Sequence, residues 1–319
     1  MALEGVIVAK RGVGLLRELN EKRTLAFLRI NKVSSRLEIA RFLGVSKNTV
    51  SLIIDQLIQD GVVREIGADD PKGVGRPKIQ ITLNSGIYKA IGLLVQQKYI
   101  QYTVLDYFSN VLESGEIFAD NRDVGNCLEQ LRGLCQTLLG RHPETLGIGI
   151  GIPGLIDPEE GIVHYSSRLT WTNVKVKESL ESRLDVPVKV LNRIKAAAID
   201  PAIVEMEKDN NSIFYLRIDE GVGGALIVNQ DIYHGASWTA GEIGHIPIVP
   251  GGPRCSCGKN GCLESIVSAP ALERLIAEEL GGGQPRGLTD TLAANRGDRR
   301  IERIMTQVGG HLGIAIAYI

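Results

Sequence analysis

Apolar residues recur along this chain with helical spacing near its start and in longer runs farther on. From Leu15 to Ile30 they return every three or four residues, which predicts a helix with one buried face. Ser35 and Glu38 have the spacing of a capping box, so a second, short helix is expected up to Leu43. Gly44 then ends that helix and supplies a tight turn.

A third helix is predicted from Ser46 to Gly61, because Ser46 can cap it and its apolar residues fall on one side. Its first turn is polar. Four residues there are candidates for contacting DNA: Lys47, Asn48, Thr49 and Ser51. A short helix, a glycine turn and a helix with a polar start form the helix-turn-helix pattern, whose second helix enters the major groove. For this segment alone, a helical module that binds another protein is the alternative.

Two short strands are predicted next, Val62–Ile66 and Lys78–Leu83, and the loop between them is rich in glycine, proline and charge. This arrangement predicts a winged helix. Arg76 and Lys78 place positive charge on the wing, which suits the phosphate backbone or the minor groove. Residues 1–86 carry 14 Lys and Arg against 9 Asp and Glu, whereas the remainder carries 22 against 28. A basic head on an acidic body favours nucleic-acid binding by the head.

The body, residues 87–319, has the apolar runs of an α/β domain. Strands are predicted at 88–95, 99–106, 111–118, 146–152 and 213–218, and helices at 124–139, 269–280 and 301–318. Strands that lead into a helix and then another strand are typical of α/β units, and a similar start after residue 213 indicates two related lobes. No apolar run reaches the length of a membrane span. Cys127 and Cys135 lie on a predicted helix and are interpreted as plain core thiols.

The segment Gly241–Glu264 gathers three of the five cysteines, Cys255, Cys257 and Cys262, with His245 ten positions before the first of them. Thiolates and a neutral imidazole are the ligands of tetrahedral zinc, and four of them close a structural site. The segment is rich in glycine, which lets the backbone turn several ligands toward one point. Three unrelated core thiols are the alternative, but a Gly-rich, polar segment fits it poorly. The sequence therefore predicts bound Zn²⁺, and this use of cysteine indicates a reducing cytoplasm.

Two carboxylates flank the predicted metal ligands. Glu242 precedes His245, and Glu264 follows the last cysteine. A zinc-bound imidazole keeps its second nitrogen for another hydrogen bond. Glu242, His245 and Glu264 together are therefore suited to a ligand with several hydroxyl groups.

This segment resembles the sequence motif of the ROK family (repressors, open reading frames and sugar kinases). The family pattern, E-x-G-H and then C-x-C-G-x-x-G-C-x-E, is matched completely by Glu242–His245 and Cys255–Glu264. The resemblance covers most of the body and implies a two-lobed, ribonuclease-H-like (actin-like) fold. It also implies that Asn192, Glu242, His245 and Glu264 contact a sugar. The Gly-Arg-Pro sequence of the predicted wing is similar to that of ROK repressors.

The chain departs from the kinase branch of that family at two places. ROK kinases carry a D-x-G-G-T phosphate loop after the first strand of the body, but Leu93–Lys98 has neither a glycine pair nor an acid for magnesium. The family's general base is the Asp of an N-D-A motif, whereas Arg193 follows Asn192 here. A guanidinium stays protonated and cannot accept a hydroxyl proton. Three roles stay open for Arg193: contact with a charged group such as a sugar phosphate, filling the pocket, or pairing with a nearby acid.

A third departure lies at the C-terminal end. Family members usually continue past the position of Ile319 with a strand and helices that complete the second lobe. The resemblance therefore implies a body that is truncated at its C-terminus, with nothing to cover the apolar helix that ends at Ile319. This departure favours the alternative of a regulator that binds no ligand.

The resulting interpretation is a cytoplasmic transcriptional repressor of carbohydrate metabolism, with xylose metabolism as the expected pathway and no enzymatic activity. The winged helix, residues 1–86, is expected to bind operator DNA, with the chain a homodimer or homotetramer. The body is expected to bind a sugar or sugar-phosphate effector, with Zn²⁺ as cofactor and no membrane partner. A ROK sugar kinase with a DNA-binding head, and a regulator that binds no ligand, are the alternatives.

Overall fold

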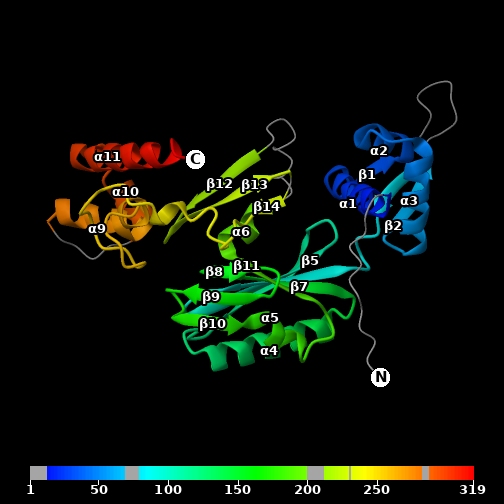
Figure 1. Ribbon diagram of the computed structural model, residues 1–319, viewed down its shortest axis with the longest axis horizontal. Coiled ribbons are helices and arrows are strands. Elements are labelled where there is room, and N and C mark those ends of the chain that lie inside the picture. Colours follow the sequence, from blue (N-terminus) through cyan, green and yellow to red (C-terminus); the bar gives the residue numbers. More distant parts are fainter. Residues whose placement is uncertain (1–12, 69–78, 200–211, 230, 282–286) are drawn as a thin grey trace.

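The computed structural model describes residues 13–68, 79–199, 212–229, 231–281 and 287–319. Figure 1 shows a small N-terminal unit in blue beside a larger body, whose two lobes are green and yellow to red. Within these residues, no helix is long and apolar enough to cross a membrane.

In residues 13–68 and 79–86, the N-terminal unit has three helices and a three-stranded sheet. Its elements are α1 (Val13–Asn31), β1 (Val33–Ser35), α2 (Arg36–Leu43), α3 (Lys47–Gln59), β2 (Val63–Ala68) and β3 (Ile79–Leu83). The predicted capping box is present, because Ser35 and Glu38 each accept a backbone N–H from the other. Gly44 ends α2 in the left-handed region, at φ 68°, and the Ser46 side chain caps α3.

The predicted apolar faces of α2 and α3 meet in the core of this unit. Its innermost residues are Leu28, Ile39, Val50, Ile54 and Ile81. The strand order is β1-β3-β2, with β2 and β3 antiparallel. The sheet therefore closes the core against the two helices, and the first turn of α3 remains at the surface.

The first lobe is built on a five-stranded sheet with the order β11-β7-β4-β5-β6. Its strands are β4 (Lys89–Val95), β5 (Tyr99–Asp106), β6 (Val111–Phe118), β7 (Thr145–Ile152) and β11 (Val188–Asn192). β4, β7 and β11 are parallel, whereas β4, β5 and β6 form an antiparallel meander. The helices α4 (Val124–Arg141) and α5 (Val176–Glu181) cover one face of the sheet (Figure 1). Burial within α4 raises the pKa of Cys127 and of Cys135 to about 12, which fits inert core thiols.

A small sheet in the first lobe has no counterpart in the predicted elements. It consists of β8 (Leu155–Asp157), β9 (Ile162–Ser166) and β10 (Trp171–Lys175). Strands this short offer too few positions for a period of two to stand out. Trp171 is fully buried and its indole N–H donates to the carbonyl of Asn121, which joins the small sheet to the rest of the lobe.

The second lobe combines a three-stranded antiparallel sheet with several helices. Its elements are β12 (Ser212–Ile218), β13 (Val222–Val228), β14 (Asp231–Tyr233), a 3-10 turn (Ile243–His245), α8 (Glu264–Val267), α9 (Ala269–Glu279), α10 (Leu288–Ala294) and α11 (Arg299–Ile316). The expectation that nothing covers the last helix is wrong for one face of α11. Val308 and Ala315 are buried on that face, which packs against α8 and α9. Ile314 and Tyr318 are exposed.

The turn between β5 and β6 joins the N-terminal unit to the body. Tyr107 and Phe108 pack against the core of the N-terminal unit. The carboxylate of Asp106 accepts the backbone N–H groups of Phe108 and Asn110 at 2.8 and 2.9 Å, which fixes the shape of the turn. Strand β5 therefore runs from the middle of the first lobe to the N-terminal unit, where Tyr88 adds a hydrogen bond to the carbonyl of Asp60.

Phe108→Ala should loosen the N-terminal unit from the body. Removing a fully buried phenylalanine ring costs about 3–5 kcal/mol, and a half-buried one such as Phe108 costs less. Protease sites between residues 84 and 88 should therefore become more accessible while the body stays folded. Limited proteolysis with mass spectrometry measures this change. Phe118→Ala is the matched control, because Phe118 is 83% exposed on the neighbouring strand. Equal digestion of wild type and Phe108→Ala would show that the turn does not hold the two parts together.

Candidate metal centre and adjoining cleft

The four predicted metal ligands meet at one point. One ligand atom from each of His245, Cys255, Cys257 and Cys262 lies within 4.8 Å of all the others. Nδ1 of His245 is 3.5 Å from Sγ of Cys255, and Sγ of Cys257 is 3.6 Å from Sγ of Cys262. Zinc at about 2.3 Å from each sulfur in a tetrahedron places the sulfurs roughly 3.8 Å apart. The donor set and its spacing therefore fit a structural zinc.

The backbone of the metal loop, Gly241–Glu264, is held in place by its own hydrogen bonds. Gly261 has φ 70°, and a Cβ there would lie 1.7 Å from the carbonyl oxygen of Val249, so only glycine fits. The N–H of Gly261 donates to the carbonyl of Pro253, and its carbonyl accepts the N–H of Ile248, both at 2.8 Å. Burial, together with the two neighbouring thiols, raises the pKa of Cys262 to about 12. Negative charges on the three sulfurs would repel one another. A bound cation would offset this repulsion and allow three thiolates to coexist.

The metal loop also positions both carboxylates. Glu264, at the start of α8, accepts the N–H of Val222 at 3.0 Å and the hydroxyl of Ser256 at 3.3 Å. Glu242 stands just before the 3-10 turn that carries His245. Burial raises the pKa of Glu242, so its neutral form is favoured more than at a surface carboxylate. A protonated carboxyl donates as well as accepts, which suits hydroxyl groups of a ligand.

Asn192 has a structural task in addition to its predicted contact with a sugar. Its side-chain oxygen accepts the N–H of Ile194 at 2.8 Å and caps α6 (Arg193–Ala198). Its amide donates to the carbonyl of Gly154, also at 2.8 Å. The side chain is therefore fixed in orientation at the edge of the cleft between the lobes.

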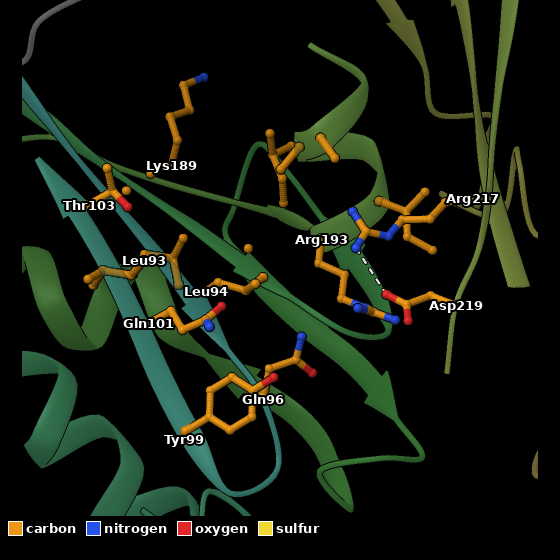
Figure 2. Close-up of a pocket in the computed structure, with 18 residues that line it drawn as sticks. Leu93, Leu94, Gln96, Tyr99, Gln101, Thr103, Lys189, Arg193, Arg217 and Asp219 are labelled. Carbon is orange, nitrogen blue, oxygen red and sulfur yellow. Dashed lines mark hydrogen bonds and ion pairs between the residues drawn. The ribbon is translucent and has the colours of Figure 1, made fainter. Parts of the chain in front are cut away.

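Two adjoining cavities occupy this cleft. The four predicted sugar-binding residues all line the smaller one, which has a volume of about 90 Å³: Asn192, Glu242, His245 and Glu264. The larger one, of about 540 Å³, has Gln96, Tyr99 and Gln101 on one side and Arg193, Arg217 and Asp219 on the other (Figure 2). Arg193 lines both cavities and therefore stands where they meet.

Several charged residues at this cleft escaped the sequence reasoning. Arg168, Arg217 and Asp219 belong to no motif, and only the fold brings them beside Arg193. Lys195 of α6 is 3% exposed, and its ammonium donates to the carbonyl of Trp238 at 2.7 Å. Burial lowers the pKa of Lys195. A lysine within an Ala-rich helix was the one signal available in the sequence for this buried charge.

Trp238, in the loop before Glu242, makes contacts on two sides. The carbonyl of Trp238 accepts the Lys195 ammonium, and the Trp238 ring stacks on His164 of β9 with ring centroids 4.6 Å apart. Lys195 and His164 thus tie the second lobe to the first across the cleft.

The structure describes four of the six predicted DNA-contacting residues. Lys47 and Asn48 are exposed at the start of α3, whereas Thr49 and Ser51 are half-buried. Thr49 also donates its N–H to the Ser46 cap. Arg76 and Lys78, on the predicted wing, lie outside the described residues.

Residues 90–319 match the ROK family. The chain belongs to the ROK family. It is 29% identical over 320 residues to the xylose repressor of Caldicellulosiruptor bescii, an alignment that covers 95% of this chain and 80% of that protein. It is also 29% identical to the DNA-binding transcriptional dual regulator NagC of Escherichia coli K12, over 96% of this chain and 78% of NagC. A solved ROK transcriptional regulator, described as a homologue of the E. coli MLC protein, superposes with a TM-score of 0.78 at 23% identity, covering 95% of this chain and 80% of its own.

We expect purified protein to contain about one zinc ion per chain, because the donor set has the composition and spacing of a closed structural site. Cys257→Ser should lose the metal and lower the melting temperature, since binding of a structural metal adds to folding free energy. Elemental analysis and a thermal melt measure the two effects. Cys127→Ala, which removes a thiol in the distant α4 core, should keep its zinc. The assignment is wrong if purified wild-type protein contains no zinc and has the same melting temperature as Cys257→Ser.

Proposed function

We propose that this ROK chain is a DNA-binding transcriptional repressor of carbohydrate metabolism genes, controlled by a sugar bound between its lobes. The observation that carries the proposal is that relatives named as repressors align over 95–96% of this chain, its N-terminal unit included. One of these relatives is named for xylose, and another is named for N-acetylglucosamine. The proposal is accordingly made for carbohydrate effectors as a class.

The N-terminal unit, residues 1–86, would act as a winged helix. The glycine turn between α2 and α3 and the antiparallel pair β2–β3 give the required order of elements. The exposed start of α3, with Lys47 and Asn48, is the part that would reach base edges and phosphates. A dimer would present two such helices to the two halves of an operator. Arg76 and Lys78 would add contacts from the wing.

The body, residues 87–319, would sense the effector and pass the signal along β5. Tyr99 and Gln101 of this strand line the larger cavity, and Tyr107 just beyond its end packs on the N-terminal core. A ligand that shifts β5 would therefore change how the N-terminal unit is held. This is a shift of population between a form that binds operator and one that does not.

A structural zinc is part of this proposal. His245, Cys255, Cys257 and Cys262 would hold it, and it would supply rigidity to the loop that carries Glu242 and Glu264. These two carboxylates, with Asn192 and His245, would bind the hydroxyl groups of the sugar.

The kinase alternative has little support in this cleft. The residues in place of the phosphate loop form a tight hairpin between β4 and β5, where the N–H of Gln96 donates to the carbonyl of Tyr99 at 2.9 Å. That N–H is thus not free to bind a phosphate. Arg193 occupies the position of the general base and cannot act as one. The curated relatives reported above are regulators, which favours the same conclusion.

Operator binding should depend on the first turn of α3. Asn48→Ala should reduce discrimination between operator and random DNA about tenfold, because one side-chain contact to a base edge carries roughly 1–3 kcal/mol. Lys47→Ala should weaken binding to both and lower the slope of log affinity against log salt by about 1. Fluorescence polarisation with DNA from upstream of the chain's own gene measures both. Gln59→Ala, exposed at the far end of α3, is the control. Salt-independent binding, or none to any duplex, would rule out this role for the N-terminal unit.

Neither the wild type nor Arg193→Asp should phosphorylate a sugar. A general base typically contributes about a hundred- to ten-thousandfold in rate, and the closed Gln96–Tyr99 hairpin would still leave ATP without a phosphate site. A coupled ADP-release assay over hexoses and pentoses, with a ROK glucokinase as positive control, measures turnover. Sugar-dependent turnover by the wild type would place this chain among the kinases.

A further inference from the structure

The size of the two cavities limits where an effector can lie. Small-molecule sites are typically about 300–1,000 Å³, whereas the cavity lined by the predicted sugar-binding residues has about 90 Å³. The adjoining cavity, with about 540 Å³, falls in that range. The larger cavity shares Arg193 and Ile194 with the smaller one, so it is the adjoining space for the part of a ligand that the smaller cavity does not hold.

Arg193 is the unpaired cation at this boundary. Arg168 donates to the carboxylate of Glu220 at 3.2 Å, and Arg217 to that of Asp219 at 3.0 Å. Arg193 has no hydrogen bond or ion pair with any other residue that the structure describes. Figure 2 shows its guanidinium beside the Arg217–Asp219 pair, on the side that faces the cavity.

The surroundings of Arg193 favour a negative ligand. Burial lowers the pKa of Arg193, and the like charges of Arg168 and Arg217 lower it further, whereas the carboxylates of Asp219 and Glu220 act in the opposite direction. A partly buried guanidinium without a partner is costly, and an oxyanion beside it would relieve both effects. Guanidinium also matches phosphate and carboxylate geometry with two parallel hydrogen bonds.

The acidic residues around the cleft would not repel such a ligand strongly. Asp219 and Glu220 are paired with arginines, and Glu264 accepts two hydrogen bonds from the protein.

We propose that the effector is an anionic carbohydrate, a sugar phosphate or a sugar acid. Its hydroxyl groups would lie against Glu242, His245 and Glu264, and its oxyanion would bind Arg193 at the mouth of the larger cavity. This inference rests on the proposed function, because it names the ligand class of the same sensor. The residue that replaces the catalytic base of the kinases thereby becomes the residue that selects the ligand.

The test uses the full chain and matched probes. Isothermal calorimetry would compare glucose with glucose 6-phosphate, xylose with xylose 5-phosphate, and N-acetylglucosamine with its 6-phosphate. Gluconate and glucuronate represent the sugar acids, and inorganic phosphate the free anion. At least one anionic probe should bind about tenfold or more tightly than its neutral counterpart, since hydrogen bonds between charged groups are the stronger class.

Three variants assign that preference to Arg193. Arg193→Gln should abolish the ratio of affinities between the anionic and the neutral probe, and Arg193→Lys should keep part of it because the charge remains. Lys189→Gln is the matched control. Lys189 is an exposed cation that lines the same cavity, and Figure 2 shows its side chain pointing away from Arg193. The control should keep the full ratio.

The outcomes separate this inference from the proposed function. Equal affinity for neutral and anionic probes, an unchanged ratio in Arg193→Gln, or inorganic phosphate binding as tightly as any sugar phosphate would overturn the inference. Absence of binding by every probe would also overturn it. Adding each probe to the DNA-polarisation assay tests the function itself. If a neutral sugar releases the protein from DNA, the chain is a sugar-responsive repressor without this anion site. If an anionic probe binds through Arg193 but the affinity for DNA does not change, the anion site exists and the probe is not an effector.

Discussion

With a metal bound, the geometry of the cleft would depend on the four-ligand cluster of His245, Cys255, Cys257 and Cys262. Glu242 precedes the first ligand and Glu264 follows the last, so the cluster fixes both ends of the loop that supplies the two carboxylates. Structural zinc contributes about 10–16 kcal/mol in small peptides, whereas a protein hydrogen bond contributes about 1 kcal/mol net. With zinc bound, metal coordination would therefore outweigh the Val222–Glu264 hydrogen bond as the determinant of loop shape.

The elements that the sequence predicted well are those with local signals. The Ser35–Glu38 capping box located α2, and apolar runs between turn residues located β5 and β6. The short sheet β8–β10 escaped prediction because its strands have only three to five residues. The metal ligands could be found because they lie close together in the sequence. The meeting of Arg168, Arg193 and Arg217 could not, since it arises only from the packing of two lobes.

Arg193 is one of the two departures that distinguish this cleft from that of a sugar kinase, beside the residues in place of the phosphate loop. An aspartate in the place of Arg193 would accept a proton from a sugar hydroxyl, whereas a guanidinium only donates. The neighbouring Asn192 keeps its place as the cap of α6, so the backbone that presents the two residues is held as a capped helix start.

The path of β5 has a consequence for the genetics of such a regulator. Its alternate residues Tyr99 and Gln101 line the larger cavity, and the turn after it carries Tyr107 and Phe108 into the N-terminal core. A pleated strand paired on both sides is stiff, so a bulky replacement at its cavity end would also displace the residues at its far end. Alleles that are constitutive, or that no longer respond to inducer, should therefore cluster on this strand although none of its residues is placed at the DNA. Selection for a new inducer at Tyr99 or Gln101 would at the same time alter basal expression, so the two traits would evolve together.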